Sequence, residues 1–327
     1  MISEWYEMIK ARKWMKKNIP FLYAWHAYVG HELDLFEAFK KSHTIDYVAN
    51  KQDISKDLLQ SWIEVGVAIN HLKEKKSGRY KVNRRLLLPK RNSLSGTLLK
   101  EMMELHIPSL LSYPELLKTQ SKIRFDDKKH GEIVARTSRL IETIAYPNYK
   151  KLIKDGNVKS IIDVGCGHGG YLQRIAQEYP HIQMVGIDKH PHVVESAEKV
   201  CESLANVDII HADVNEWSPS SKENDLVMMN NIMHYVAPDK RFDLVSKMSK
   251  WLHKKGKIII ITPVRNSEHG KEFSAVFNSF FSAHSNLHTL PTKTDLETIA
   301  NKLGMRMRQF DPIIKEGSWY VAVIENK

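Results

Sequence analysis

Apolar residues in the first third of the chain recur at spacings of three and four, which is the period of an amphipathic helix. The pattern predicts helices over residues 3–17, 21–39, 46–50 and 55–69, with Ser55 as an N-cap. Two short strand-like runs follow on either side of the turn Lys75-Lys76-Ser77-Gly78, and they predict a β-hairpin. Three helices followed by a basic hairpin indicate a winged helix.

The rest of the chain falls into a helical stretch and a stretch of alternating elements. Residues from about 93 to 151 show helical spacings, and we expect breaks near Pro108, Pro114 and Pro147, because proline removes a backbone donor. From residue 160 onward, short apolar runs alternate with helical patterns. These runs predict strands at residues 160–164, 182–187, 207–211, 226–229, 257–262, 305–310 and 319–324.

Strands that alternate with helices form an open, mostly parallel sheet with helices on both faces. We therefore expect an α/β fold, a Rossmann-like doubly wound sheet preceded by an N-terminal helical winged-helix domain. The last two predicted strands lie close together in the sequence, which permits an antiparallel finish. The expected boundaries are a winged-helix domain over 1–105, a helical connector over 106–150 and a Rossmann-like catalytic domain over 151–327.

Composition excludes several classes of protein. The 327 residues suit two domains, and a hydrophobic share of 42% with a charged share of 27% is ordinary for a globular protein. No apolar run is long enough to cross a membrane, and the start of the chain, with Glu4 and Glu7, lacks a secretory signal. Two cysteines, Cys166 and Cys201, make neither a disulfide framework nor a four-thiolate zinc site. We expect a reduced, cytoplasmic protein.

The net charge of +11 comes mostly from one short segment. Between Lys73 and Arg91 the chain carries nine basic residues and one acid, Glu74, a balance of +8. A basic hairpin can contact DNA phosphates, or it can keep an exposed sheet edge soluble. The preceding segment, 55–69, has one basic residue, Lys56, among apolar side chains and suits packing. We therefore favour dimerisation over nucleic-acid binding, and a DNA-binding regulator that senses a nucleoside cofactor is the third alternative for function.

A glycine-rich loop follows the first strand of the second half. From Asp163 to Gly170 it reads Asp-Val-Gly-Cys-Gly-His-Gly-Gly and lies between an apolar strand and a helix. Glycines let the backbone turn tightly and approach a ligand. Asp188 and Asp213 close the next two strands, where carboxylates can bind the hydroxyls of a ribose and the amino group of an adenine. Three carboxylates at one edge of a sheet predict a nucleoside site.

A dinucleotide is the alternative ligand of this loop. Gly165, Gly167 and Gly170 fit the dinucleotide fingerprint, and an acid follows about twenty residues later. Asp163 and Asp213 weigh against this interpretation, because the fingerprint requires neither of them.

Three segments carry a resemblance to a known family. Residues 163–169, 186–188 and 212–213 resemble the first three motifs of class I S-adenosylmethionine-dependent methyltransferases. The N-terminal part, including Glu32-Leu33-Asp34-Leu35-Phe36 and the hairpin, resembles the dimerisation domain of small-molecule O-methyltransferases. The resemblance implies a small-molecule acceptor and a homodimer formed through the N-terminal domain. It also implies S-adenosylmethionine as cofactor, with the candidate binding residues Asp163, Gly165, Gly167, Asp188 (ribose), Asp213 (adenine) and Asn230.

His234 matches the histidine that acts as general base in the O-methyltransferases. An ordinary histidine titrates near pH 6.5, which suits a base at neutral pH. Family members often carry an acid at the end of the fifth strand to orient this histidine, but Thr262 stands there. Asn230 and Asn231 replace the lysine and tryptophan that often precede it. Oxygen methylation with His234 as base is the first expectation, without a simple pair of base and orienting acid.

A second group of histidines offers an alternative chemistry. His284 lies on an apolar stripe of phenylalanines, and His288 follows four residues later. If the helix continues, these two histidines and His234 can share a divalent metal. A metal would chelate the enol form of a 2-keto acid and favour methylation at carbon. Metal-assisted C-methylation through His234, His284 and His288 is the second expectation, and some relatives that methylate 2-keto acids resemble this arrangement.

Overall fold

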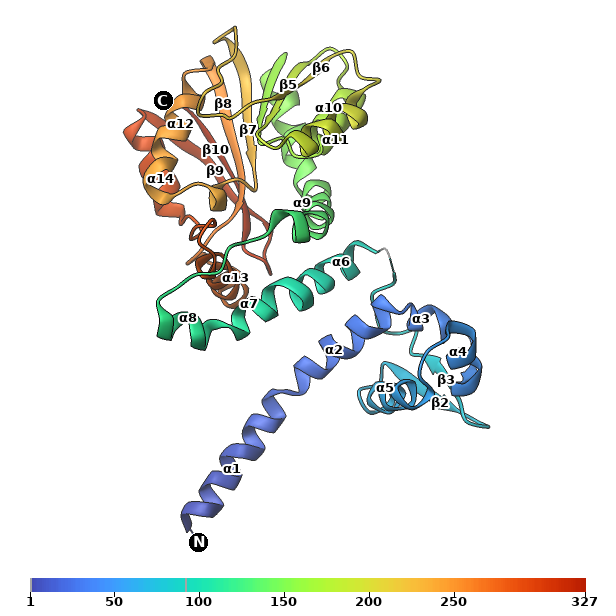
Figure 1. Ribbon diagram of the computed structural model, residues 1–327. Helices are drawn as coiled ribbons and strands as arrows, with labels where there is room; N and C mark the ends of the chain where they lie inside the picture. Colours follow the sequence, from blue (N-terminus) through green and yellow to red (C-terminus); the bar gives the residue numbers. More distant parts are fainter. Residues whose placement is uncertain (1, 92) are drawn as a thin grey trace. The chain divides into compact units, whose positions relative to one another are not determined.

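The chain divides into two units, Met1–Ile107 and Pro108–Lys327, and helices form most of the first unit. The structure, a computed structural model, describes residues 2–91 and 93–327. Asp34 interrupts the helix expected over 21–39, because its backbone adopts a left-handed φ of 52°. The helices of this stretch are α1 (Ile2–Lys17), α2 (Ile19–Glu32), α3 (Leu35–Ala38), α4 (Ile45–Gln52) and α5 (Lys56–Ala68) (Figure 1).

The predicted hairpin is confirmed and belongs to a three-stranded antiparallel sheet. The hairpin strands are β2 (Leu72–Lys75) and β3 (Arg79–Val82). A further strand, β1 (His43–Thr44), pairs with β3, and its two residues are too short to show a period in the sequence. The predicted N-cap is also present, because the Ser55 hydroxyl accepts the Leu58 N–H at 3.4 Å.

Between the hairpin and the main sheet the chain is helical, as expected. The elements are α6 (Leu94–Glu101), a π-helical turn (Met102–His106), α7 (Ile107–Leu111), α8 (Tyr113–Thr119) and α9 (Asp127–Gly156). The expected break at Pro147 is wrong, because α9 continues through this proline. Proline removes one helix hydrogen bond, and the neighbouring Ala145, Tyr146 and Tyr149 are buried and hold the helix against its surroundings.

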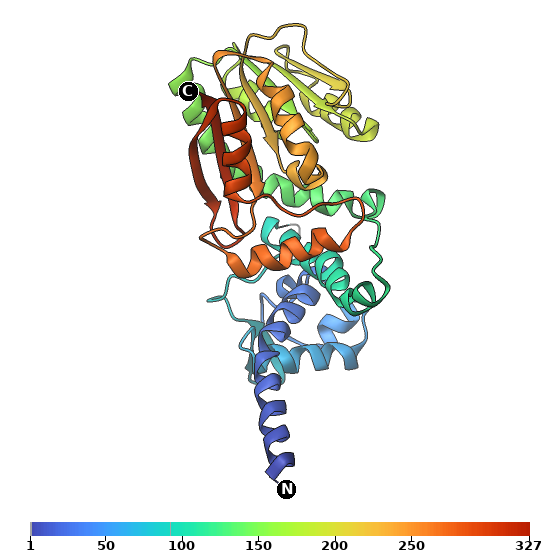
Figure 2. The same cartoon turned by 90° about the vertical axis from the view of Figure 1, so that its left-hand side faces the viewer.

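The second unit is built on a seven-stranded sheet of order β6-β5-β4-β7-β8-β10-β9. Neighbours from β6 to β8 run parallel, and β10 is antiparallel to both β8 and β9, which confirms the antiparallel finish (Figure 2). The strands are β4 (Ser160–Val164), β5 (Gln183–Asp188), β6 (Val207–His211), β7 (Asn224–Asn230), β8 (Leu252–Pro263), β9 (Met305–Ile314) and β10 (Trp319–Asn326).

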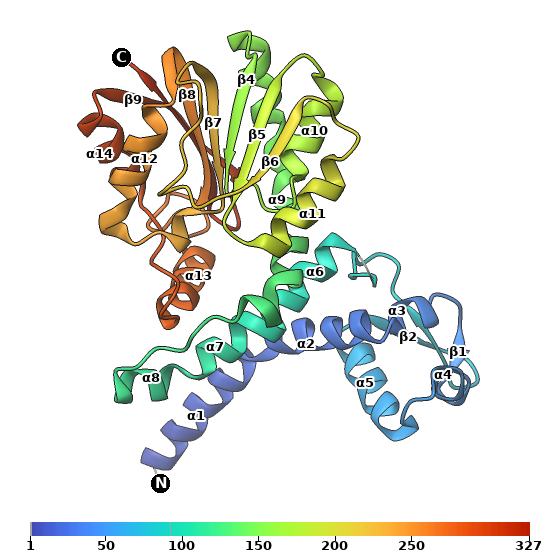
Figure 3. The same ribbon diagram turned by 45° about the horizontal axis from the view of Figure 1, so that its top comes forward.

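Helices accompany this sheet at both of its ends, as Figure 3 shows: α10 and α11 lie beside β4 to β6, and α12 and α14 lie beside β8 and β9. Their bounds are α10 (Gly170–Glu178), α11 (Pro191–Cys201), α12 (Arg241–Ser249), α13 (Lys271–Ala283) and α14 (Lys293–Lys302). The continuous apolar runs of β4, β7 and β8 are buried at the centre of the core. The expected Rossmann-like α/β fold class is confirmed. No helix in the described part of the chain is both long and apolar enough to cross a membrane.

Candidate cofactor-binding and catalytic site

The strand order places the glycine loop at a crevice of the sheet. The chain runs from β4 outward to β5 and β6, and then returns to the other side of β4 to form β7 and β8. In open α/β sheets, ligands bind outside the carboxyl ends of the strands at such a reversal of order. Asp163 lies near the end of β4, and Asn230 ends the adjacent β7. The reversal therefore brings together candidates that are 67 positions apart in the sequence.

The glycine loop has the backbone that only glycine adopts readily. Gly165 and Gly167 have φ values of 66° and 57°. A β-carbon on Gly165 would lie 2.4 Å from Cδ1 of Ile232, so a side chain there would force Ile232 to move in addition to straining the backbone. A β-carbon on Gly167 would meet no atom within 4 Å. The backbone at Gly167 is thus open to a ligand on the side where other residues carry a side chain.

Asp188 connects the loop to the end of β5. Its carboxylate accepts the Gly167 N–H at 3.2 Å and the His190 N–H at 3.0 Å. The side chain is only partly buried, so its remaining lone pairs are accessible to a hydroxyl. Asp188 therefore fixes the loop and still presents an acceptor at the sheet edge.

Asp163 is 1% exposed, and neither of its carboxylate oxygens has a hydrogen-bond partner in the described part of the chain. Burial raises its pKa well above the usual range, and the charges of Asp188 and Glu142 raise it further. The side chain of Asn230 opposes this shift in pKa. Tyr149 from α9 donates its hydroxyl to Oδ1 of Asn230, so a residue that the sequence did not indicate orients this amide.

The last glycine of the loop lies against an acid from another element. A β-carbon on Gly170, the first residue of α10, would lie 2.0 Å from Oε2 of Glu142 on α9. In dinucleotide sites the pyrophosphate occupies this helix N-terminus. Here the Glu142 carboxylate lies beside the first residue of the helix, and it would repel a second anion at that end. The arrangement disfavours a dinucleotide.

Asp213 lies two residues beyond the end of β6 and does not close the strand as expected. Its Oδ1 accepts the backbone N–H of Asn215 at 2.7 Å and the side-chain amide of Asn215 at 2.8 Å. These bonds fix the carboxyl within its turn, where it is partly exposed.

His234 lies in a short 3-10 turn, Met233–Tyr235, after β7. The side chain is buried, and its ring stacks on Phe281 at a centroid distance of 4.4 Å. Burial, with a smaller contribution from the Arg241 charge, lowers its pKa to about 3. Its Nδ1 has no hydrogen-bond partner within the described ranges. Thr262 donates its hydroxyl to the Pro263 carbonyl, so it does not take the place of the orienting acid.

Arg241 is a residue that the sequence analysis missed. It is buried, and its guanidinium donates to the carbonyl of Met233 at 3.0 Å, to that of Val236 at 3.2 Å and to that of Thr289. The backbone turn that carries His234 is therefore held from both ends by one cation. No sequence motif marks this role, because backbone carbonyls leave no residue pattern and one of the three, that of Thr289, lies 48 positions away.

The predicted metal site is not assembled. Across residues 2–91 and 93–327, no group of three or more His, Cys, Asp or Glu side chains is arranged to hold a metal ion. The expectation required a helix through His288, but α13 ends at Ala283 and the backbone of His284 is extended. Nδ1 of His284 bonds to the Phe280 carbonyl at 2.8 Å, and His288 contacts His234 through its backbone N–H.

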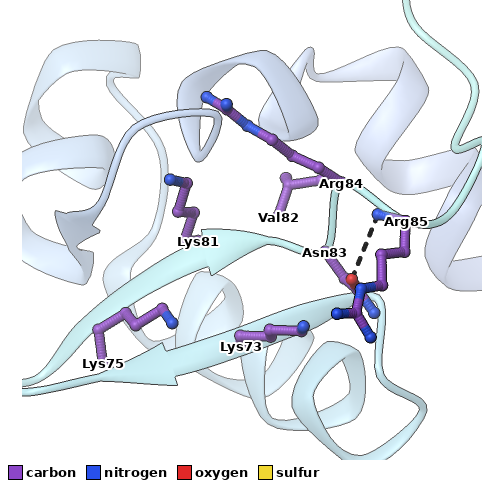
Figure 4. Close-up of a pocket in the computed structure, with 7 residues that line it drawn as sticks. All are labelled: Lys73, Lys75, Lys81, Val82, Asn83, Arg84 and Arg85. Carbon is purple, nitrogen blue, oxygen red and sulfur yellow. Dashed lines mark hydrogen bonds between the residues drawn. The ribbon is translucent and has the colours of Figure 1, made fainter.

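The basic segment forms a hollow on the solvent face of the hairpin (Figure 4). Cross-strand pairing sets Lys73 opposite Lys81 and Lys75 opposite Arg79. Asp57 and Glu64, in contrast, are exposed on the preceding helix α5. Acids there would repel DNA phosphates, which argues against α5 entering a groove. The residues that line the hollow are Lys73, Lys75, Lys81, Val82, Asn83, Arg84 and Arg85.

Comparison with known proteins agrees with this geometry. Residues 161–256 match the family model of the methyltransferase domain. A probable (S)-tetrahydroprotoberberine N-methyltransferase of Papaver bracteatum is 31% identical over 31% of this chain and 27% of its own length. A malonyl-[acyl-carrier protein] O-methyltransferase of Halalkalibacterium halodurans is 27% identical over 32% of this chain and 39% of its own. The matched segments thus cover well under half of these curated relatives.

Solved structures resemble the chain over nearly its whole length. Mitomycin 7-O-methyltransferase superposes with a TM-score of 0.76 at 14% identity, covering 98% of this chain and all of that one. Human N-acetylserotonin methyltransferase, solved with its cofactor, gives 0.74 at 15% identity, covering 97% of each chain. At such identities the likeness establishes the fold.

Proposed function

We propose that this protein, which carries a class I S-adenosylmethionine-dependent methyltransferase domain, transfers a methyl group from S-adenosylmethionine to a small molecule. The observation that carries the proposal is the set of acids around the glycine loop. Asp163 is buried without a partner, Asp188 is tied to the loop, and Glu142 lies at the start of α10. A cationic cofactor compensates this negative charge, whereas a dinucleotide adds to it.

The residues present fit S-adenosylmethionine. The open face of Gly167 gives the methionine part room against the backbone, and Asp188 presents an acceptor to the ribose. Asp163 and the Asn230 amide Nδ2, both buried without partners in the portion of the chain described here, provide polar atoms that a ligand would satisfy. Asp213 is our candidate for the adenine amino group. When bound, the cofactor supplies an activated methyl group on a sulfonium.

We propose an oxygen acceptor with His234 as the base. The low pKa of His234 keeps its imidazole neutral at physiological pH, and only a neutral imidazole can take the hydroxyl proton. Arg241 holds the turn that carries it, so the ring has a fixed position. The Phe281 ring packed on His234 excludes water from one face of the base. The solved relatives titled as O-methyltransferases support this choice.

We further propose a homodimer that works in the cytoplasm. Most aromatic and methionine residues of α1, including Trp5, Trp14 and Met15, are more than half exposed within one chain. An isolated helix of 16 residues is only marginally stable in water, so a partner surface would stabilise α1. Both cysteines are buried as free thiols, which suits a reducing compartment.

Calorimetric titration with S-adenosylmethionine tests the function. We expect micromolar binding that weakens at least about tenfold in Asp188→Asn, because the ribose loses a charged acceptor. Asp208→Asn is the matched control, since Asp208 is an exposed acid on the neighbouring strand β6, and it should bind like the parent protein. Absence of binding in folded, cofactor-free protein would refute the proposed function.

A further inference from the structure

Glu142 stands outside every motif that the sequence analysis singled out. It lies in the middle of α9, yet its carboxylate contacts the first residue of α10, where Oε2 fills the space of a β-carbon on Gly170. Its side chain is only 12% exposed. A carboxylate in this position costs free energy unless a cation compensates it.

The cations of the protein compensate Glu142 only in part. Nε of Arg174 lies 3.4 Å from Oε1, a contact without the close paired geometry of a forked ion pair. Arg139 adds a weaker attraction, and burial still prevails, so the pKa of Glu142 is raised. The carboxyl is therefore left with unused capacity for a positive partner.

A second buried acid feels the charge of Glu142. Asp163 is nine-tenths or more buried, lacks a hydrogen-bond partner among the described residues, and couples electrostatically to Glu142. The two acids come from different elements, the middle of α9 and the end of β4. Each of these buried acids makes ionisation of the other more costly, and the contact with Arg174 offsets that cost for Glu142 only in part. A small cation held between them removes that cost.

We propose that Glu142, together with Asp163, binds the α-ammonium group of S-adenosylmethionine and selects a cofactor that carries an amino acid. This inference rests on the function proposed above and adds a binding residue from α9 to the site. The sulfonium is a poor partner for Glu142, because it has no N–H to donate. The ammonium offers three donors, which suits two carboxylates.

Two ligands separate this role from a structural one. S-Adenosylhomocysteine carries the ammonium, whereas 5′-methylthioadenosine has the same nucleoside and thioether without the amino acid. In Glu142→Gln we expect the affinity for S-adenosylhomocysteine to fall about ten- to a hundredfold, as for loss of a charged hydrogen bond. The affinity for 5′-methylthioadenosine should stay within about twofold. Glu178→Gln is the control, because Glu178 lies at the other end of α10 and forms an ion pair with Lys150, 2.6 Å away.

The parent protein gives a test that does not depend on the folding of a variant. It should bind the deaminated analogue of S-adenosylhomocysteine about tenfold or more weakly than S-adenosylhomocysteine itself. Equal affinity for these two ligands would overturn the proposal. So would a Glu142→Gln protein that binds both nucleosides as before, or that loses both equally. If the parent protein binds neither nucleoside, the proposed function fails instead.

Discussion

Acidification should destabilise the second unit through His234. The folded pKa of this buried histidine is about 3, whereas an unfolded chain titrates near 6.5. Between these values the unfolded state binds a proton that the folded state does not, so stability falls as the pH falls. Each pH unit below 6.5 costs about 1.4 kcal/mol, which gives about 2 kcal/mol at pH 5.0.

Urea unfolding at pH 7.5 and pH 5.0, followed by circular dichroism, measures this loss. His234→Gln carries an amide that does not titrate, so its stability should fall by about 2 kcal/mol less than that of the parent protein over the same interval. Other buried histidines, such as His26 in the first unit, affect both proteins alike. Equal losses in the two proteins would refute the reasoning, and so would an NMR titration of the His234 imidazole with a midpoint near pH 6.5.

Three further changes test the site and the assembly. In Gly165→Ala the new β-carbon meets Ile232 at 2.4 Å, so we expect the free energy of unfolding to fall by about 1–3 kcal/mol in the same urea assay. Gly78→Ala is the control, because Gly78 has a φ of 61° but a β-carbon there meets no atom within 4 Å, so its stability should fall only by the smaller cost of backbone strain. Arg241→Met leaves three carbonyls without their donor, so we expect the free energy of unfolding, measured by thermal denaturation, to fall by about 3 kcal/mol. An unchanged melting temperature would show that Arg241 does not hold the turn that carries His234. Deletion of residues 2–17 should convert a dimer to a monomer in sedimentation, and a truncated protein that still sediments as a dimer would contradict the role given to α1.

The parallel sheet could be predicted because its signal is local. Strands buried on both faces are continuous apolar runs, and each of the seven predicted runs falls on a strand, with β4 and β6 matching at both ends. The glycine loop is local as well, since its turn needs a positive φ at Gly165 and Gly167. The strands and the glycine loop, which depend on residues adjacent in the sequence, were therefore predicted correctly.

The failures share a different physical cause. Glu142 contacts Gly170, 28 positions away, and Tyr149 contacts Asn230, 81 positions away. One acceptor of Arg241, the Thr289 carbonyl, is 48 positions away, and no spacing within a motif reports such contacts. The histidine pair 284 and 288 failed for the converse reason. Its spacing is meaningful only on a helix, and α13 ends at Ala283. Pro147 was also misjudged, because tertiary burial of its neighbours outweighs one lost hydrogen bond.

The sign of the charge at the start of α10 separates two ligands that the glycine spacing alone leaves open. A helix N-terminus attracts anions, and the dinucleotide sites use it for a pyrophosphate. In this protein the Glu142 carboxylate lies beside the first residue of that helix, so its charge repels an incoming anion there. The nearby acids Asp163 and Asp188 oppose a further negative charge, and a bound cation would favour the ionised form of Asp163, whose pKa is raised by burial. Removal of Glu142 should therefore weaken the hold on an ammonium and, at the same helix end, relieve the repulsion of an anion.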